Sequence, residues 1–219
     1  MRLNLDRLYS GKKVFFSSDL HLNHNPSWEI PIWKQRGFNS VQEMNDGIIK
    51  SINDTVNYDD VLFLLGDFTL NCKPEQFHNL RGRINCQNIL TLFGNHPSPI
   101  LSIYKDFIVN QFGDGFKNLH IYPLTVANVT IFGHYAEAIV DNQLIILQHF
   151  PLSIWEEQKR GAWHLTGHSH GGFEDTLPTT TNTGKILDVG WDVFRKPVSM
   201  NDIRSIMAKK QYVKKDRNH

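Results

Sequence analysis

The sequence predicts an α/β domain with one or two mixed β-sheets, and three observations support this prediction. Short apolar runs rich in Val, Ile, Leu and Phe recur along the chain, and such runs are typical of buried strands. Amphipathic helical segments separate some of these runs, which lie closer together in the second half, as in layered α/β domains. The chain has 219 residues, 40% of them hydrophobic, so it can bury a core.

Six apolar runs are predicted to form strands. They cover residues 14–16, 61–65, 89–93, 129–132, 144–147 and 186–189. A helix is predicted to begin after Ser40, because Ser40 and Glu43 have the spacing of a capping box. It should run to about Asn53 and present one apolar face. Ser199 and Asp202 give a second helix-start signal near the C-terminus.

The chain is predicted to form one domain, because no repeat, low-complexity tract or linker divides it. We expect this domain to span residues 1–208. Residues 209–219 include five Lys and Arg residues. We expect them to form a basic, frayed C-terminal tail.

The composition excludes several classes of protein. Lys and Arg total 23 against 22 Asp and Glu, a net charge of +1, which gives no electrostatic argument for general binding to nucleic acids or membranes. Two cysteines are too few for a disulfide scaffold or an all-cysteine metal site. No apolar stretch reaches the roughly 18 residues of a membrane span, and the N-terminus lacks the pattern of a secretory signal. We therefore expect a cytoplasmic protein that does not bind membranes.

Histidine is unusually frequent, with 11 residues, and several histidines lie in small polar clusters directly after apolar runs. Five runs end in this way, and the clusters contain Asp19 and His21, Asp67, Asn95 and His96, His149, and His168 and His170. Each cluster alone is compatible with an ordinary turn. Because ligands bind at the carboxyl ends of strands in open α/β sheets, the five clusters together favour one shared site.

The residue types in these clusters indicate a metal site. Carboxylate, amide and imidazole ligands together suit Mn, Fe, Zn or Ni better than Ca or Cu(I). Even without His96, the clusters offer seven such side chains, too many for one tetrahedral ion. They suit two ions about 3.5–4 Å apart that share a bridging carboxylate, an arrangement used in phosphoryl transfer.

In their order along the chain, the clusters resemble the signature of the calcineurin-like metallophosphoesterase superfamily. The matching residues are Asp19-x-His21, Gly66-Asp67, Gly94-Asn95-His96, His149 and Gly167-His168-x-His170. The resemblance extends over residues 14–203, nearly the whole chain. Further segments are similar to a subgroup of short, single-domain prokaryotic and phage phosphoesterases, and they cover residues 38–45, 163–168, 189–192 and 196–199.

The resemblance implies a fold and a set of ligands. The fold is a four-layer αββα sandwich of two mixed sheets flanked by helices, with the metals at one edge. The implied cofactors are two divalent transition-metal ions, Mn²⁺ first among them, with Fe, Zn or Ni as alternatives. The first ion would take Asp19, His21 and His170, the second Asn95, His149 and His168, and Asp67 would bridge both.

The resemblance also implies a catalytic role for His96, which matches a histidine that is not a ligand. That histidine contacts the phosphate and protonates the leaving oxygen. Relatives commonly have an acidic residue directly after it, whereas this chain has Pro97. Either the activity is then reduced, or a carboxylate from elsewhere in the chain orients His96, with Glu156 and Asp192 as the candidates.

The expected activity is hydrolysis of a phosphodiester or phosphomonoester, most readily a small nucleotide-like substrate, by attack of a metal-bridging hydroxide. His24 and Arg160 are candidate substrate contacts, beside the ordinary alternatives of a loop position and an exposed salt bridge. His164 is expected to be a buried, hydrogen-bonded strand residue. Two other functions stay open: a nuclease on DNA or RNA strands, and a metal-binding scaffold without activity.

Overall fold

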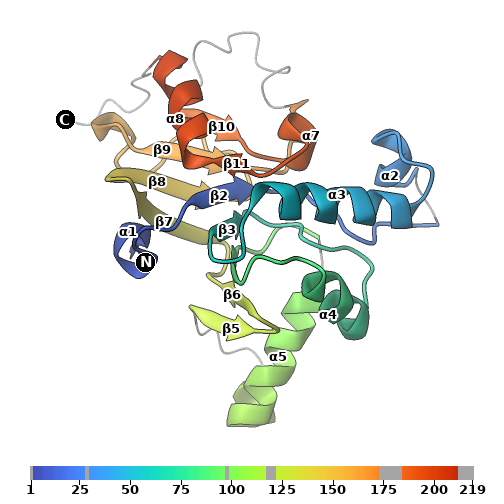
Figure 1. Ribbon diagram of the computed structural model, residues 1–219. Coiled ribbons are helices and arrows are strands. Elements are labelled where there is room, and N and C mark those ends of the chain that lie inside the picture. Colours follow the sequence, from blue (N-terminus) through green and yellow to red (C-terminus); the bar gives the residue numbers. More distant parts are fainter. Residues whose placement is uncertain (1, 28–29, 97–98, 117–121, 173–183, 212–219) are drawn as a thin grey trace.

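A computed structural model of the chain describes residues 2–27, 30–96, 99–116, 122–172 and 184–211. Within them the chain forms two β-sheets with helices around them (Figure 1). One sheet has the strand order β1 (Arg2–Asn4), β7 (Tyr135–Val140), β8 (Gln143–Gln148), β9 (Trp163–Thr166), β10 (Ile186–Asp188). The other has the order β11 (Val198–Ser199), β2 (Val14–Ser17), β3 (Val61–Leu64), β4 (Asn88–Thr91), β6 (Val129–Ile131), β5 (Leu124–Val126).

Both sheets are mixed, as predicted. The first contains antiparallel β7 and β8 beside parallel β8 and β9. The second contains parallel β2, β3 and β4 with antiparallel β11 at one edge. The helices are α1 (Leu5–Leu8), α2 (Ile32–Gln35), α3 (Val41–Thr55), α4 (Pro74–Gly82), α5 (Pro99–Phe112), α7 (Trp191–Phe194) and α8 (Met200–Lys209), with 3₁₀ turns η1 (Asp114–Phe116) and η2 (Gln158–Arg160).

The two sheets pack face to face, and the alternation of side chains along each strand decides which residues fill the space between them. Phe16 and Phe63 of the six-stranded sheet belong to one buried cluster with Ile145 of β8. Their neighbours Phe15 and Leu62 point to the opposite face and join a second cluster with α3, α4 and α5. The six-stranded sheet therefore has the second sheet on one face and helices on the other (Figure 1).

Helix α3 begins where the sequence predicts. Ser40 Oγ accepts a hydrogen bond from Glu43 N at 3.1 Å. The capping box is only half formed, because Glu43 Oε2 accepts from Asn39 N at 2.7 Å instead of reaching back to Ser40 N. The buried residues of the helix are Met44, Asn45, Ile48, Ile49 and Ile52. The second predicted start is confirmed as well, since the Ser199 hydroxyl accepts from Asp202 N at the beginning of α8.

The outer face of the five-stranded sheet is covered differently. Ile146 of β8 and Ile186 of β10 pack against Trp155 and Ala162, which come from the segment between β8 and β9. That segment contains a single 3₁₀ turn, η2. In the part of the chain that the structure describes, a loop thus occupies the place where the αββα prediction has a helical layer.

The C-terminal region differs slightly from the prediction. Helix α8 includes Lys209, where the frayed tail was expected to begin, and residues 212–219 of that tail lie outside the described residues. None of the described helices is long and apolar enough to span a membrane.

His164 on β9 is fully buried and fully hydrogen-bonded, as expected. Its Nδ1 donates to the carbonyl oxygen of Ile146 at 3.0 Å, and its Nε2 accepts from Leu152 N at 3.1 Å. Burial disfavours the charged imidazolium and lowers the pKa of His164 to about 4. This histidine is therefore a structural residue that stays neutral at neutral pH.

We expect His164 to make stability depend on pH. Its pKa is about 4 in the fold against 6.5 for a free imidazole, so the unfolded chain takes up a proton first as the pH falls. The stabilisation is complete above pH 6.5 and is lost toward pH 4, with a loss of about 2 kcal/mol by pH 5. Urea unfolding in EDTA at pH 7.5 and pH 5 should show this extra loss in the wild type relative to His164→Gln. Equal losses in the two proteins would contradict the prediction.

Candidate metal centre

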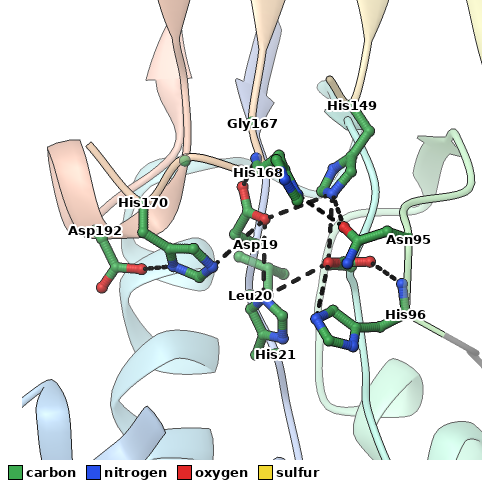
Figure 2. A network of polar contacts seen from close by, with 12 residues as sticks. Asp19, Leu20, His21, Asn95, His96, His149, Gly167, His168, His170 and Asp192 are labelled. Carbon is green, nitrogen blue, oxygen red and sulfur yellow. Dashed lines mark hydrogen bonds and ion pairs between the residues drawn. The ribbon is translucent and has the colours of Figure 1, made fainter. Parts of the chain in front are cut away.

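The polar clusters predicted from the sequence meet at one edge of the two sheets. Strands β2, β3 and β4 run parallel, so Asp19, Asp67 and Asn95 follow their carboxyl ends on the same side. Strands β8 and β9 are also parallel, and His149 and His168 follow their ends. Figure 2 shows side chains from both sheets pointing toward one another at this edge.

Asp19, His21 and His170 form the group that the resemblance assigns to the first ion. Asp19 Oδ1 lies 3.8 Å from His21 Nε2 and 4.0 Å from His170 Nε2. Donor atoms that bind one ion at about 2 Å lie about 3–4 Å from one another. One ion can therefore contact all three side chains.

Asp67 lies between this group and a second one. Its Oδ2 is 3.7 Å from His21 Nε2 and 3.4 Å from His149 Nε2. In the second group, Asn95 Oδ1 lies 2.7 Å from His149 Nε2 and 2.9 Å from His168 Nδ1. The structure thus brings all seven predicted ligands together, with Asp67 within reach of both groups as a bridging ligand must be.

Several donor atoms at the centre of this cluster are buried without a hydrogen-bond partner. Within the described ranges, Asp19 Oδ1 and both ring nitrogens of His21 have none. Leaving a buried polar group unpaired costs about 1–3 kcal/mol, and native proteins contain few such groups. A metal ion between the two residues would satisfy Asp19 Oδ1 and His21 Nε2, so these side chains fit a metal site.

The backbone is strained at five of the seven predicted ligands. Asp19, His21, Asp67, His168 and His170 all have φ between 47° and 69°, in the left-handed region that residues with a side chain seldom adopt. Each such residue costs of order 1–3 kcal/mol and persists only where the surrounding structure holds it. A hydrogen bond from His21 N to the carbonyl oxygen of Asp67, at 2.9 Å, is one such restraint. These backbone conformations direct the side chains toward a common point (Figure 2).

Two glycines allow the loops of the cluster to approach one another. A Cβ on Gly94 would lie 2.0 Å from Asp67 Oδ1, and a Cβ on Gly167 would lie 2.4 Å from Asp19 Oδ2. Real Cβ atoms essentially never come within 3.0 Å of a heavy atom outside their own residue and its two chain neighbours. Any larger residue at either position would displace a predicted ligand.

Burial and contacts set the protonation of the cluster. Burial acts to raise the pKa of Asp19, but its contacts with His21, His149 and His170 lower that pKa to about 2. The pKa of Asp67 is lowered in the same way against the effect of burial. Burial lowers the pKa of His21, whereas nearby carboxylates outweigh burial and raise the pKa of His149 and His170. Ionised carboxylates and a neutral His21 are the forms that bind metals.

His96 lies beside the cluster, and its side chain is 41% exposed. Its Nε2 is 4.0 Å from Asp67 Oδ2, and its backbone N donates to Asp67 Oδ1 at 3.2 Å. Pro97, which replaces the acidic residue of the resembled family, lies outside the described residues. Among the described residues, the carboxylate that contacts His96 is that of Asp67.

Neither of the two carboxylates predicted to orient His96 contacts it within the described residues, so that prediction is wrong. Asp192 Oδ2 accepts hydrogen bonds from His170 Nδ1 at 2.6 Å and from Arg36 Nη2 at 2.7 Å. Glu156 is exposed, and no hydrogen bond or ion pair joins it to His96 in the described part of the chain. Asp192 belongs to the site, but through a different histidine.

The structure brings one of the two candidate substrate contacts to the site. His24 is buried, its ring centroid lies 5.8 Å from that of His21, and it lines a cavity next to the cluster. Its Nδ1 accepts a hydrogen bond from Ile32 N. Arg160 has a 72% exposed side chain that forms a salt bridge with Glu157 at 2.8 Å. Arg160 is not among the residues that line the cavity.

The sequence analysis missed two residues that support the cluster. Arg36 is buried and forms hydrogen bonds to Asp192 and to the backbone of the Asp19 loop. Asp188, at the end of β10, accepts from Ser169 Oγ at 2.5 Å and from Gly171 N at 3.1 Å. Both hold loops whose partners are distant in sequence, and no local pattern marks such residues.

Comparisons with known proteins are consistent with the fold and name no activity. No protein-family profile matches the chain. The chain is 27% identical to the "uncharacterized protein MJ1445" of Methanocaldococcus jannaschii, over 94% of this chain and 97% of that protein. The crystal structure of a protein of unknown function from Aquifex aeolicus, AQ665, has a TM-score of 0.59 and 17% identity, covering 90% of this chain and 100% of that one. This second likeness shows a shared fold.

We expect Gly94→Ala to damage the cluster, because the new Cβ would collide with the Asp67 carboxylate. Such overpacking costs about 1–3 kcal/mol. Gly82→Ala is the matched control, since its Cβ would meet nothing within 4 Å and the residue lies in α4. Thermal unfolding with and without Mn²⁺ should show a lower melting temperature and a smaller Mn²⁺-induced rise for Gly94→Ala only. Wild-type values for that variant would refute the role given to Gly94.

Proposed function

We propose that this chain is a di-metal phosphoesterase that hydrolyses a phosphodiester or phosphomonoester of small, nucleotide-like size. The observation that carries the proposal is the buried cluster around Asp19, His21 and Asp67, whose inner donor atoms lack hydrogen-bond partners within the described structure. The resemblance of the sequence clusters to calcineurin-like metallophosphoesterases supports the same class of reaction.

The donor set suits two divalent transition-metal ions, Mn²⁺ foremost, with Fe, Zn or Ni as alternatives. Such ions, when bound, supply Lewis-acid stabilisation for the phosphoryl oxygens and an activated water as nucleophile. Asp67 would hold both ions, and the remaining ligands would divide into Asp19, His21 and His170 for the first and Asn95, His149 and His168 for the second.

His96 is suited to act as the general acid. Its backbone is fixed by the hydrogen bond to Asp67, while its partly exposed ring lines the cavity beside the cluster. An imidazole in this place can contact a phosphoryl oxygen and give a proton to the departing alkoxide. His21 is not available for this role, because it is buried among the predicted ligands.

The cavity supports a small substrate. It has a volume of about 430 Å³, within the roughly 300–1,000 Å³ of small-molecule sites. Its wall includes His96 and His170 on the side of the cluster and Ile32, Gln35 and Arg195 away from it. Apolar, amide and cationic groups together suit a compact molecule that carries both an organic body and negative charge.

We expect His96→Ala to slow hydrolysis according to the leaving group. With a poor leaving group, such as the alkoxide of a 2′,3′-cyclic nucleotide, kcat should fall about 10²–10⁴-fold. With bis(4-nitrophenyl) phosphate the fall should be much smaller, because nitrophenolate leaves without a proton. His78→Ala is the matched control, since His78 is exposed on α4. The same loss on both substrates would argue against proton donation by His96.

The Mn²⁺-loaded protein should be tested on cyclic nucleotides, dinucleotides, monoesters and single-stranded oligonucleotides. We expect turnover of the small esters. Cleavage of strands at physiological salt with no turnover of small esters would favour the nuclease alternative. If the protein binds metal but turns over none of these substrates, the proposed enzymatic activity is refuted, and the alternative of a metal-binding scaffold without activity remains.

A further inference from the structure

Arg36 is a buried cation wedged between two parts of the candidate metal centre. Its side chain is 1% exposed. Its Nε and Nη2 donate to the two carboxylate oxygens of Asp192, at 2.9 and 2.7 Å. Its Nη1 and Nη2 also donate to the carbonyl oxygens of Leu20, at 2.9 Å, and Asp19, at 2.7 Å. A planar guanidinium can make this fork, whereas a lysine ammonium cannot.

Asp192 connects this arginine to the ligand His170. Its Oδ2 accepts a hydrogen bond from His170 Nδ1 at 2.6 Å (Figure 2). Because Nδ1 carries the proton, the lone pair of Nε2 faces Asp19 and the first-ion position. Hydrogen bonds of this kind fix the tautomer and ring orientation of metal-binding histidines.

Arg36 is therefore linked to all three ligands of the first group, to Asp19 directly and to the other two through one intervening residue each. It holds the carbonyl oxygen of Asp19 itself, the carbonyl oxygen of Leu20 in the peptide that leads into His21, and His170 through Asp192. The backbone of all three ligands is left-handed and requires such restraint.

The second group of ligands does not use this device. His149 is oriented by the carbonyl oxygen of Leu65, which lies 2.9 Å from its Nδ1. His168 is held by its backbone N, which donates to Asp19 Oδ2 at 2.9 Å, and by its contact with Asn95. Arg195 is also near Asp192, at 3.9 Å, but it is half exposed and too distant for a hydrogen bond.

We propose that Arg36 and Asp192 are positioning residues for one metal position only, the one formed by Asp19, His21 and His170. This inference rests on the proposed function in so far as the cluster binds two ions. It adds that Arg36 and Asp192 support the first position alone, so that this position can be weakened while the second is kept, although Asp19 and Asp67 connect the two groups.

Isothermal titration of the full chain with Mn²⁺, after removal of metals with EDTA, tests this proposal. We expect two binding events in the wild type. Asp192→Asn should weaken one of them about 10- to 100-fold, the usual effect of removing such a partner, and leave the other within twofold. The spin-coupled EPR signal of a Mn²⁺ pair should be replaced by that of a single ion at matched loading. Asp141→Asn is the matched control, because Asp141 forms an exposed pair with Arg204.

The unchanged binding event shows that the variant is folded, and circular dichroism of the metal-free protein checks the same point. If Asp192→Asn does not fold, Arg36→Lys and Asp192→Glu keep the charges but break the fork, and the same selective weakening is expected. Equal weakening of both events, or of neither, would overturn the inference. Two ions bound with the expected selectivity but no ester hydrolysis would overturn the proposed function alone. A wild type that binds no ion would overturn both.

Discussion

Asp19 and Asp67 are buried at the ends of adjacent parallel strands, with 0% and 4% of their surfaces exposed, and both are held ionised by neighbouring histidines. Two negative charges in such a place are costly unless cations or hydrogen-bond donors surround them. Part of the local structure provides that surrounding: the imidazole of His149 lies beside Asp67, and the backbone N of His168 donates to Asp19 Oδ2. Two bound cations would complete it, and they would supply a positive field for a phosphate on a chain whose net charge is only +1.

The fold makes this placement possible through strand direction and loop size. Parallel β2, β3 and β4 deliver their polar ends to one edge, and β8 and β9 of the second sheet deliver theirs to the same edge. Gly94 and Gly167 keep the loops close enough for the two groups to share Asp67. Folds of this kind serve many reactions, so the side chains of this site, and not the fold, determine the chemistry.

Much of this arrangement could be predicted from the sequence, because apolar runs followed by polar clusters are local signals. The mixed α/β fold, helix α3 and the convergence of the polar clusters follow from them, whereas two sheets and the set of seven ligands were expected from the resemblance. The sequence analysis missed β7, in which buried residues alternate with more exposed ones that include Tyr135 and Glu137. It also missed α5, although its buried residues Ile100, Tyr104 and Ile108 recur at helical spacing. Arg36 could not be found in this way, since Asp192 is 156 positions away. For the same reason Asp192, the partner of His170, was only a candidate partner of His96.

The most direct measurement of the central claim is anomalous diffraction above the Mn absorption edge, from crystals grown with Mn²⁺. We expect two peaks about 3.5–4 Å apart, one among Asp19, His21 and His170 and the other among Asn95, His149 and His168, with Asp67 contacting both. Full occupancy by a single ion would reduce the site to a mononuclear one. The absence of any peak at this cluster, with Mn²⁺ in excess, would contradict the claim.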